Sequence, residues 1–282
     1  MADQGTLCDA RTGDPTLRAL IAARTGGGLT PDNVLITAGA SAALFIVAIS
    51  LLRTGDHVIV ERPNYATNNI VTPRVLGCAV DCLDLDFDRG FALDLDAPAG
   101  MAGPETKLIS LTTPHNPTGV ALGADCLRQV IGLAERGGAY VLVDETYREM
   151  SLARAPPPVA TLSERAISVG SLPKSFGIPG IRVGWIVSRS PSLIHRFLCA
   201  KEQSGIFGSV VDEAIAAHAD AGADAWLEGN DRRLRDALAR VAAWMDGEPL
   251  LEWVTPGGGC VCFTAYARGR GRRHRRLLSH RL

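Results

Sequence analysis

A serine, a lysine and an arginine lie close together where two apolar runs of the sequence meet. Ser171 and Lys174 follow the strand-like run 166–170, and Arg182 lies in the next apolar run, 181–187. Surface lysines usually lie on polar faces, so this placement predicts that Lys174 points into a crevice and is partly desolvated. Desolvation favours the amine, the form that bonds a carbonyl carbon as a Schiff base. Ser171 and Arg182 would add a hydroxyl and a permanent cation, a pair suited to a phosphate.

An aspartate ends another apolar run. Residues 139–143 are strand-like, and Asp144 follows them directly. A carboxylate at the end of a buried strand is costly unless it has a partner, and a protonated ring nitrogen of a ligand would be one. The alternative is that Asp144 caps the helix after the strand.

A rigid amide is expected after the strand at 107–111. The stretch 112–119 contains two prolines and a glycine, which excludes regular structure and holds Asn116 at the strand's edge. Such an amide can donate a hydrogen bond to an anionic oxygen. The neighbouring His115 is interpreted as a structural residue rather than as an acid or base.

Small residues connect the strand at 33–37 with an apolar helix at 42–52. They include Gly39, Ala40 and Ser41. A strand, a small-residue turn and a helix start bring free N–H groups and the positive end of a helix dipole together, which suits a phosphate. An ordinary strand-to-helix turn has the same composition, so both interpretations stay open.

An aromatic ring follows the next strand. Tyr65 comes after the strand at 55–61 and a Pro–Asn turn. The ring serves either for packing or as a platform that stacks on a flat heteroaromatic ligand.

Strand-like and helical patterns alternate over residues 30–190, which predicts an α/β fold with a mostly parallel sheet and helices on both faces. Ligands bind such sheets at the carboxyl ends of the strands. Because Asn116, Asp144 and Lys174 all follow strands, we expect them in one site. A further strand is expected at 75–85, and the other expected helices are 15–25, 125–137, 192–204, 210–221 and 226–245.

The stretch Ser171 to Trp185, SLPKSFGIPGIRVGW, resembles the lysine signature of the class I/II pyridoxal-phosphate enzymes, the aspartate-aminotransferase superfamily of fold type I. HNPTG at 115–119 and DETY at 144–147 resemble two further motifs of that family. The resemblance covers residues 10–263 in matching order. It implies pyridoxal 5'-phosphate as the cofactor and no metal.

The resemblance also implies roles for individual residues. Lys174 would carry the cofactor as an internal aldimine, Asp144 would pair with its ring nitrogen, and Tyr65 would stack on its ring. Asn116 and Tyr147 would contact its phenolic oxygen. The residues expected to hold its phosphate are Gly39, Ala40, Ser41, Ser171 and Arg182.

Two domains are expected. Residues 1–190 would form the large cofactor-binding domain, and residues 191–282 a partial α+β small domain. The Pro-Gly-Gly-Gly segment within 253–263 resembles the family strand that begins the small domain. The basic stretch that follows has no aromatic interleaving, so about residues 267–282 are expected to be disordered, without a nucleic-acid or lipid role.

Composition and charge limit the kinds of partner and the cellular location that we expect for the protein. The 282 residues are 46% hydrophobic and carry a formal net charge of −1, which gives no overall reason to expect nucleic acid or a membrane as partner. The longest apolar run, 42–49, is too short to span a bilayer, and no secretion signal is recognised. Seven scattered cysteines form no Cys-x-x-Cys pair, so we expect core thiols and a cytoplasmic location.

The leading hypothesis is a homodimeric aminotransferase that moves an amino group between an amino acid and a 2-keto acid. Two alternatives remain open. One is a lyase, decarboxylase or cyclase with the same cofactor contacts, and the other is a truncated, non-catalytic homologue.

Overall fold

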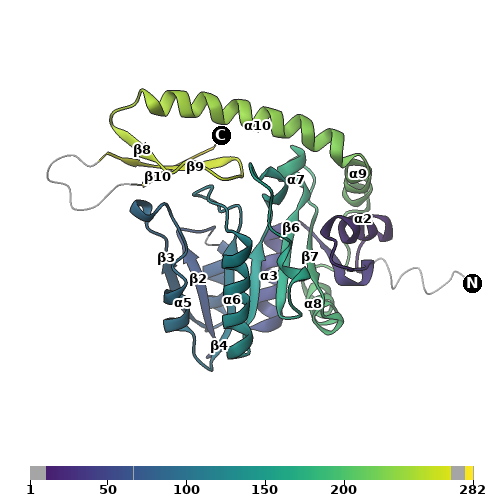
Figure 1. Cartoon of the computed structure of the whole chain (residues 1–282). Coiled ribbons are helices and arrows are strands. Elements are labelled where there is room, and N and C mark those ends of the chain that lie inside the picture. Colours follow the sequence, from purple (N-terminus) through teal and green to yellow (C-terminus); the bar gives the residue numbers. More distant parts are fainter. Residues whose placement is uncertain (1–10, 66, 268–276, 282) are drawn as a thin grey trace, which may run out of the picture.

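Seven strands form one sheet through the centre of the structure, a computed structural model that describes residues 11–65, 67–267 and 277–281 (Figure 1). Their order is β1-β7-β6-β5-β4-β2-β3. Strands β2 to β6 run parallel, and β7 is antiparallel to both of its neighbours, β6 and β1. The strands are β1 (Val34–Thr37), β2 (His57–Arg62), β3 (Ala79–Asp84), β4 (Thr106–Thr112), β5 (Tyr140–Asp144), β6 (Ala166–Ser171) and β7 (Gly184–Ser188).

Helices cover both faces of this sheet. On one face α8 packs on β1 and β7, and α3 packs on β6 and β7. On the other face α6 packs on β4 and β5, and α2 with α9 packs on β1 and β7. The helices are α2 (Pro15–Thr25), α3 (Ala40–Leu51), α4 (Thr72–Val75), α5 (Asp96–Met101), α6 (Ala124–Gly137), α7 (Leu172–Phe176), α8 (Pro191–Ser204), α9 (Val210–Ala221) and α10 (Ala223–Asp246). The predicted α/β fold is confirmed.

A long helix and a small sheet lie above the carboxyl ends of the central strands. Helix α10 crosses the top of the molecule in Figure 1 and ends near a three-stranded antiparallel sheet. That sheet consists of β8 (Leu251–Trp253), β9 (Val261–Tyr266) and β10 (Leu277–Arg281). The division of the chain near residue 190 stays a prediction.

The basic stretch at the end of the sequence is partly ordered, contrary to the prediction. We predicted disorder over about 267–282, but Leu277–Arg281 forms β10, paired antiparallel with β9. The ladder satisfies backbone groups that charge patterning alone cannot reveal as paired. Residues 268–276 and 282, like the first ten, lie outside the described residues.

Several element boundaries are corrected. Lys174 lies in the short helix α7, which was not among the expected helices, because Gly177 with φ +68° ends a helical turn that Pro173 opens. The strand predicted at 75–85 begins only at Ala79, because the chain before it forms α4. The segment 253–263 is not a single strand, because Trp253 ends β8, Val261 begins β9, and the Pro-Gly-Gly-Gly residues lie between the two strands.

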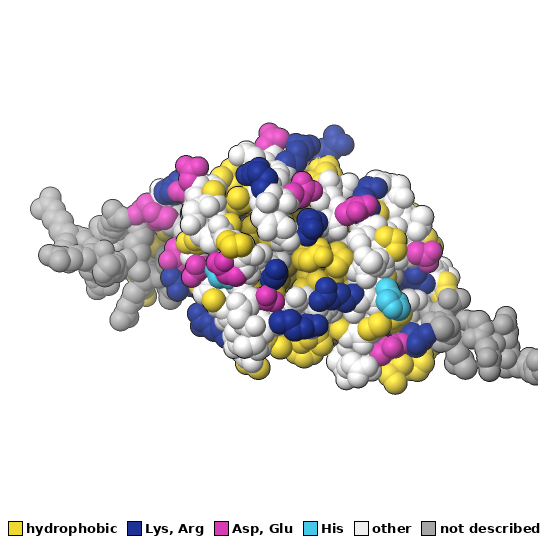
Figure 2. Space-filling view, turned by 90° about the horizontal axis from the view of Figure 1, so that it is seen from below, with side chains coloured by type: hydrophobic (Ala, Val, Ile, Leu, Met, Phe, Trp, Pro, Cys, Tyr) yellow, Lys and Arg dark blue, Asp and Glu magenta, His cyan; other side chains and the backbone are white. Residues whose placement is uncertain are grey.

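The surface mixes charges of both signs. On the face shown in Figure 2, basic and acidic side chains lie interspersed among apolar ones. Within the described ranges no helix is long and apolar enough to cross a membrane. All described cysteines carry free thiols, and Cys8 lies outside the described residues.

Candidate active site

The carboxyl ends of β4, β5 and β6 open into a cavity of about 190 Å³, called here the front pocket. Nine of the ten residues predicted for the site line it, and Gly39 lies directly behind its wall. The lining residues are Ala40, Ser41, Leu44, Tyr65, Thr112, Asn116, Asp144, Thr146, Tyr147, Ser171, Pro173, Lys174 and Arg182. The fold therefore brings the predicted residues together, whereas their roles remain predictions.

Strand ends position the floor of the front pocket. Thr112 ends β4 and Asp144 ends β5, and the two residues are register partners. Ser171 ends β6 opposite Gly184 of β7, and its hydroxyl donates a hydrogen bond to the Val183 carbonyl at 3.3 Å. Side chains from three adjacent strands thus meet at one edge of the sheet.

The turn before α3 lies against an arginine. Gly39 is the N-cap of α3 with φ +85°, and a Cβ there would lie 2.7 Å from Arg182 Nη2. A Cβ on Gly184 would lie only 2.5 Å from the Gly39 carbonyl carbon, so β7 also begins against this turn. Two glycines allow this approach, which places the N-terminal N–H groups of α3 beside the Arg182 guanidinium.

Asp144 is buried at the floor, with 9% of its surface exposed. Its Oδ1 accepts a hydrogen bond from the Thr146 backbone N–H at 3.0 Å. Burial raises the pKa of Asp144, and Thr146 opposes that rise. Among the described residues, no lysine, arginine or histidine lies within ion-pair distance of this carboxyl. A cationic group of a ligand would therefore stabilise its charged form.

Lys174 lies at the mouth of the pocket. Its side chain is exposed, so the predicted partial desolvation is wrong for this chain. The reason is that α7 holds the lysine on the rim, whereas its neighbours Pro173 and Ser175 are buried. No other described residue makes a hydrogen bond or ion pair with Lys174 Nζ, so the amine is available to a ligand.

Side chains of α10 hold α7 in place. Trp226 Nε1 donates to the Phe176 carbonyl at 2.6 Å, and Asn230 Nδ2 donates to the Ser175 carbonyl at 2.9 Å. These bonds satisfy carbonyls at the end of the short helix and fix the backbone around Lys174. Sequence reasoning did not find this support.

The remaining predicted residues differ in exposure. Tyr65 is 44% exposed at the rim, Tyr147 is 6% exposed, and Asn116 is half-buried in the loop after β4. His115, interpreted as structural, is 3% exposed and does not line the pocket.

Two threonines that sequence reasoning missed also line the pocket. Thr112 Oγ1 and Thr146 Oγ1 are buried and make no hydrogen bond of normal length and angle within the described part of the chain, but Thr112 lowers the pKa of Glu61 and Thr146 that of Asp144 as weak donors. The sequence could have indicated both positions, because Thr112 lies at a strand end and Thr146 precedes the predicted site residue Tyr147. Buried hydroxyls with only weak partners beside a cavity are expected where a ligand completes their bonding.

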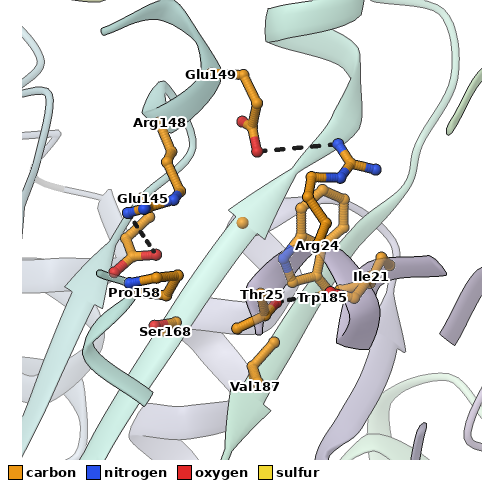
Figure 3. A pocket seen from close by; sticks show the side chains of 11 residues that line it. Ile21, Arg24, Thr25, Glu145, Arg148, Glu149, Pro158, Ser168, Trp185 and Val187 are labelled. Carbon is orange, nitrogen blue, oxygen red and sulfur yellow. Dashed lines mark hydrogen bonds and ion pairs between the residues drawn. The ribbon is translucent and has the colours of Figure 1, made fainter. Parts of the chain in front are cut away.

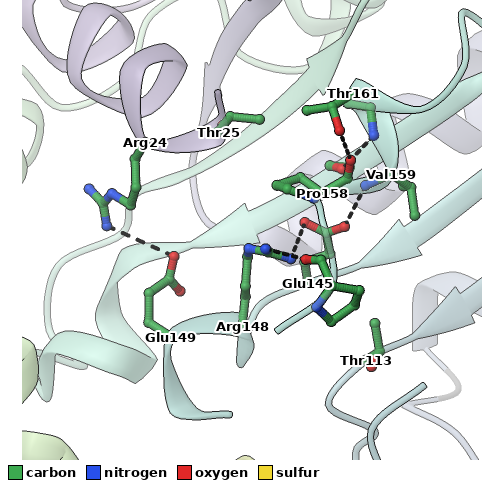
Figure 4. A network of polar contacts seen from close by, with 12 residues as sticks. Arg24, Thr25, Thr113, Glu145, Arg148, Glu149, Pro158, Val159 and Thr161 are labelled. Atoms are coloured by element: carbon green, nitrogen blue, oxygen red, sulfur yellow. Dashed lines mark hydrogen bonds and ion pairs between the residues drawn. The ribbon is translucent and has the colours of Figure 1, made fainter. Parts of the chain in front are cut away.

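A second cavity, called here the rear cavity, has a volume of about 30 Å³ and lies between the sheet and the end of α2 (Figure 3). Its charged side chains belong to Arg24, Glu145, Arg148 and Glu149. These residues pair with each other: Arg24 Nη1 lies 3.9 Å from Glu149 Oε1, and Arg148 Nη1 lies 3.8 Å from Glu145 Oε2 (Figure 4). The rear cavity holds none of the predicted site residues.

Sequence comparison finds a family profile and individual proteins that this chain resembles. The profile of the family described as "Aminotransferase class I and II" matches residues 4–272. The chain is 31% identical over 260 residues to capreomycidine synthase of Streptomyces vinaceus, covering 90% of this chain and 65% of that protein.

Solved structures agree as well. A PLP-dependent aminotransferase from Streptococcus suis superposes with a TM-score of 0.86 at 30% identity, covering 91% of this chain and 67% of that chain. The PLP-dependent cyclase OrfR superposes with a TM-score of 0.81 at 29% identity, covering 94% of this chain and 70% of that chain.

The chain spans 65% and 59% of the length of the first curated relatives it matches. The match of the family profile nonetheless extends over nearly the whole chain. Pyridoxal phosphate is the cofactor of this family. The chain belongs to the class I and II aminotransferases.

Proposed function

We propose that the chain binds pyridoxal phosphate in the front pocket and moves an amino group between an amino acid and a 2-keto acid. The observation that carries the proposal is the pairing of two groups in one cavity. A buried carboxyl without a protein cation, Asp144, lies at the floor, and an amine without a protein partner, Lys174, lies at the mouth. A cofactor with a basic ring nitrogen and an aldehyde fits both groups.

The phosphate end of the pocket supports the same fit. The start of α3 supplies backbone N–H groups, and Arg182 beside Gly39 supplies a permanent cation. Ser41 and Ser171 line the same wall. These donors would hold the phosphate, because a helix N-terminus and a guanidinium both favour a dianion.

The residues along the cavity would perform separate tasks. Lys174 would hold the cofactor's aldehyde carbon covalently until a substrate amine displaces it, and would then move a proton between substrate and cofactor carbons. Asp144 would keep a proton on the ring nitrogen. When bound, the cofactor supplies an electron sink for charge at the substrate carbon.

The remaining polar and aromatic groups would orient the ring. Tyr65 would stack on it from the rim, while Asn116 and Tyr147 would donate to its phenolic oxygen. Sequestering the ring between these groups would restrict it to one orientation over Asp144.

The test is a titration of the purified chain with pyridoxal phosphate, followed by borohydride reduction and mass mapping. We expect a visible absorbance band and a single label on Lys174. Lys107→Ala is the matched control, because Lys107 is an exposed lysine that lies outside the front pocket. A folded chain with no band, or a label on another lysine, would contradict the proposal and favour the non-catalytic alternative.

A cyclase or related lyase is the second candidate function. The observation that favours it is that a matched relative is named a synthase, and that a structural neighbour is a PLP-dependent cyclase. A keto-acid-dependent transfer assay separates the candidates. Transfer of the amino group supports the aminotransferase, whereas conversion of an amino acid with no need for a keto acid supports the second candidate.

We infer that two copies of the chain form a homodimer. Apolar side chains are exposed near the start of α9, where Phe207 is 54%, Val210 81% and Val211 67% exposed. A second copy covering them would remove apolar surface from water. Sedimentation should give a dimer for the chain and a monomer for Val210→Asp, and a monomeric parent chain would contradict the inference.

The free thiols of the described cysteines support a cytoplasmic location, where thiols stay reduced.

A division of the chain near residue 190 into cofactor-binding and small domains also belongs to this proposal. Limited proteolysis near that position would test it.

A further inference from the structure

A buried acid and a buried imidazole lie together outside the lining of the front pocket. Glu61 of β2 is 1% exposed and His115 is 3% exposed. Glu61 Oε1 lies 3.5 Å from His115 Nε2, and neither atom has another hydrogen-bond partner in the described part of the chain. The second ring nitrogen, Nδ1, lies 2.7 Å from Thr118 Oγ1.

The surroundings of Glu61 contain no strong cation. Among the described residues, no lysine or arginine lies within ion-pair distance of its carboxyl. The groups that face it are His115 from the loop after β4, Asp144 at the end of β5 and the Cys126 thiol of α6. An ionised Glu61 would therefore be a buried anion beside a second carboxyl, which is costly.

The proton affinities agree with this geometry. Burial raises the pKa of Glu61 to about 8, and the nearby Asp144 adds to the rise while Thr112 opposes it. Burial lowers the pKa of His115 to about 4, against the opposing effect of the Pro63 carbonyl. At neutral pH the pair is therefore a carboxylic acid and a neutral imidazole.

One arrangement of protons satisfies the pair. In this arrangement the Glu61 hydroxyl would donate toward His115 Nε2, and the Nδ1–H would donate to Thr118 Oγ1. Every polar hydrogen of the pair is then directed at an acceptor, and the pair carries no net charge.

We propose that Glu61 is a positioning residue of the site, held as a neutral acid by His115 so that Asp144 remains the one ionised carboxylate under the cofactor ring. This inference rests on the proposed role of Asp144. A second negative charge behind Asp144 would make it take up a proton, and a protonated Asp144 cannot hold a proton on the ring nitrogen.

The first arm of the test uses the chain without cofactor. We compare the melting temperatures of the parent chain and Glu61→Gln from pH 6 to pH 9. Glutamine keeps the shape and neutrality of the acid, so the variant should gain about 5 °C on the parent chain as the pH rises through the Glu61 titration. Glu164→Gln, at an exposed position, is the control and should show no such gain.

The second arm measures the dissociation constant of pyridoxal phosphate over the same pH range. The two proteins should bind equally at pH 7, and the parent chain should bind about tenfold more weakly than Glu61→Gln at pH 9. Effects of pH on Lys174 and on the phosphate are common to both proteins and cancel in the ratio.

The outcomes separate this inference from the proposed function. A constant melting difference would show that Glu61 is not held as an acid, and equal pH profiles for binding would show that it does not act through Asp144; either result overturns the inference. Loss of cofactor binding by the parent chain, with the melting gain intact, would overturn the proposed function and with it the positioning role. Should Glu61→Gln fail to fold, the carboxylic-acid carbonyl band of the double variant Asp144→Asn with Glu145→Gln in the infrared replaces the first arm, and its absence at pH 7 overturns the inference.

Discussion

The front pocket and the rear cavity share one segment, residues 144–149, but satisfy their polar groups differently. Asp144 and Thr146 face the front, whereas Glu145, Arg148 and Glu149 face the rear. In front, the Asp144 carboxyl lacks a cation and the Thr146 hydroxyl lacks a normal hydrogen bond among described residues. The front pocket thus leaves bonding capacity for a ligand.

The rear cavity pairs its charged side chains with opposite charges of the protein, while the Arg24 guanidinium nitrogens make no hydrogen bond of normal geometry within the described residues. Glu145 Oε1 accepts a hydrogen bond from Val159 N–H at 2.9 Å, and its other oxygen faces Arg148. Arg24 reaches Glu149 (Figures 3 and 4). It also reaches Asp220 and lies over the Phe176 ring at 5.6 Å. The same segment therefore supports function on one side and stability on the other, so substitutions should separate the two.

Lys174→Ala should give the largest effect, and only on function. We expect amino transfer to fall by about 10³-fold or more, because the amine would both hold the cofactor and move the proton. Stability to urea should change by less than about 0.5 kcal/mol, because the side chain is exposed and unpaired among described residues. Lys107→Ala serves as the control, and turnover of Lys174→Ala at the parent rate would contradict the comparison.

Arg24→Ala should act on stability. Removing the guanidinium leaves Asp220, whose side chain is 2% exposed, as a buried carboxylate without its cation. We expect a loss of about 3 kcal/mol in the free energy of unfolding, measured in urea. Arg128→Ala, which breaks an exposed pair with Asp125, is the matched control and should have a much smaller effect. Equal losses in both variants would show that the ion pairs of Arg24 in the rear cavity do not stabilise the fold.

Glu145→Gln should change how stability depends on pH. Burial raises the pKa of Glu145 to about 7, above its ordinary value in the unfolded chain. The folded state therefore holds this proton more tightly, and the resulting stability is present at low pH and lost as the pH rises through about 7. Between pH 5 and pH 8 the variant should gain about 2 kcal/mol relative to the parent chain. A constant difference in the free energy of unfolding would contradict this assignment.

Thr146→Val should give the smallest effect and sharpen the comparison. The hydroxyl has no normal hydrogen bond within the described chain, so replacing it with a methyl should leave stability unchanged or raise it by about 0.5 kcal/mol. If a ligand completes its bonding, the affinity for pyridoxal phosphate should fall several-fold. Unchanged affinity would assign Thr146 to packing alone.

Sequence patterns predicted much of this site for physical reasons. Apolar runs of strand length, each followed by a polar residue, placed Asp144 and Asn116 at the carboxyl edge of a parallel sheet, and the fold confirms both positions. Gly39 was recognisable because a tight turn before an apolar helix requires small residues. These signals depend on residues that are close together in the sequence, so they can be recognised without the tertiary structure.

Other features depend on residues far apart in the chain. The exposure of Lys174 was predicted wrongly, because the rim position of α7 is set by Trp226 and Asn230 of α10. The pairing of β10 with β9 was missed for the same reason, since a backbone ladder leaves little trace in charge patterning.

The sequence by itself determined the class of fold, the order of the cofactor motifs and the residues that meet at the strand ends, because periodicity and turn chemistry act over a few residues. Tertiary structure decided which polar groups find partners. Three features depend on distances between separate elements, which only packing fixes. They are the ion pairs of the rear cavity, the polar groups of the front pocket that lack a strong partner, and the contact between Glu61 and His115.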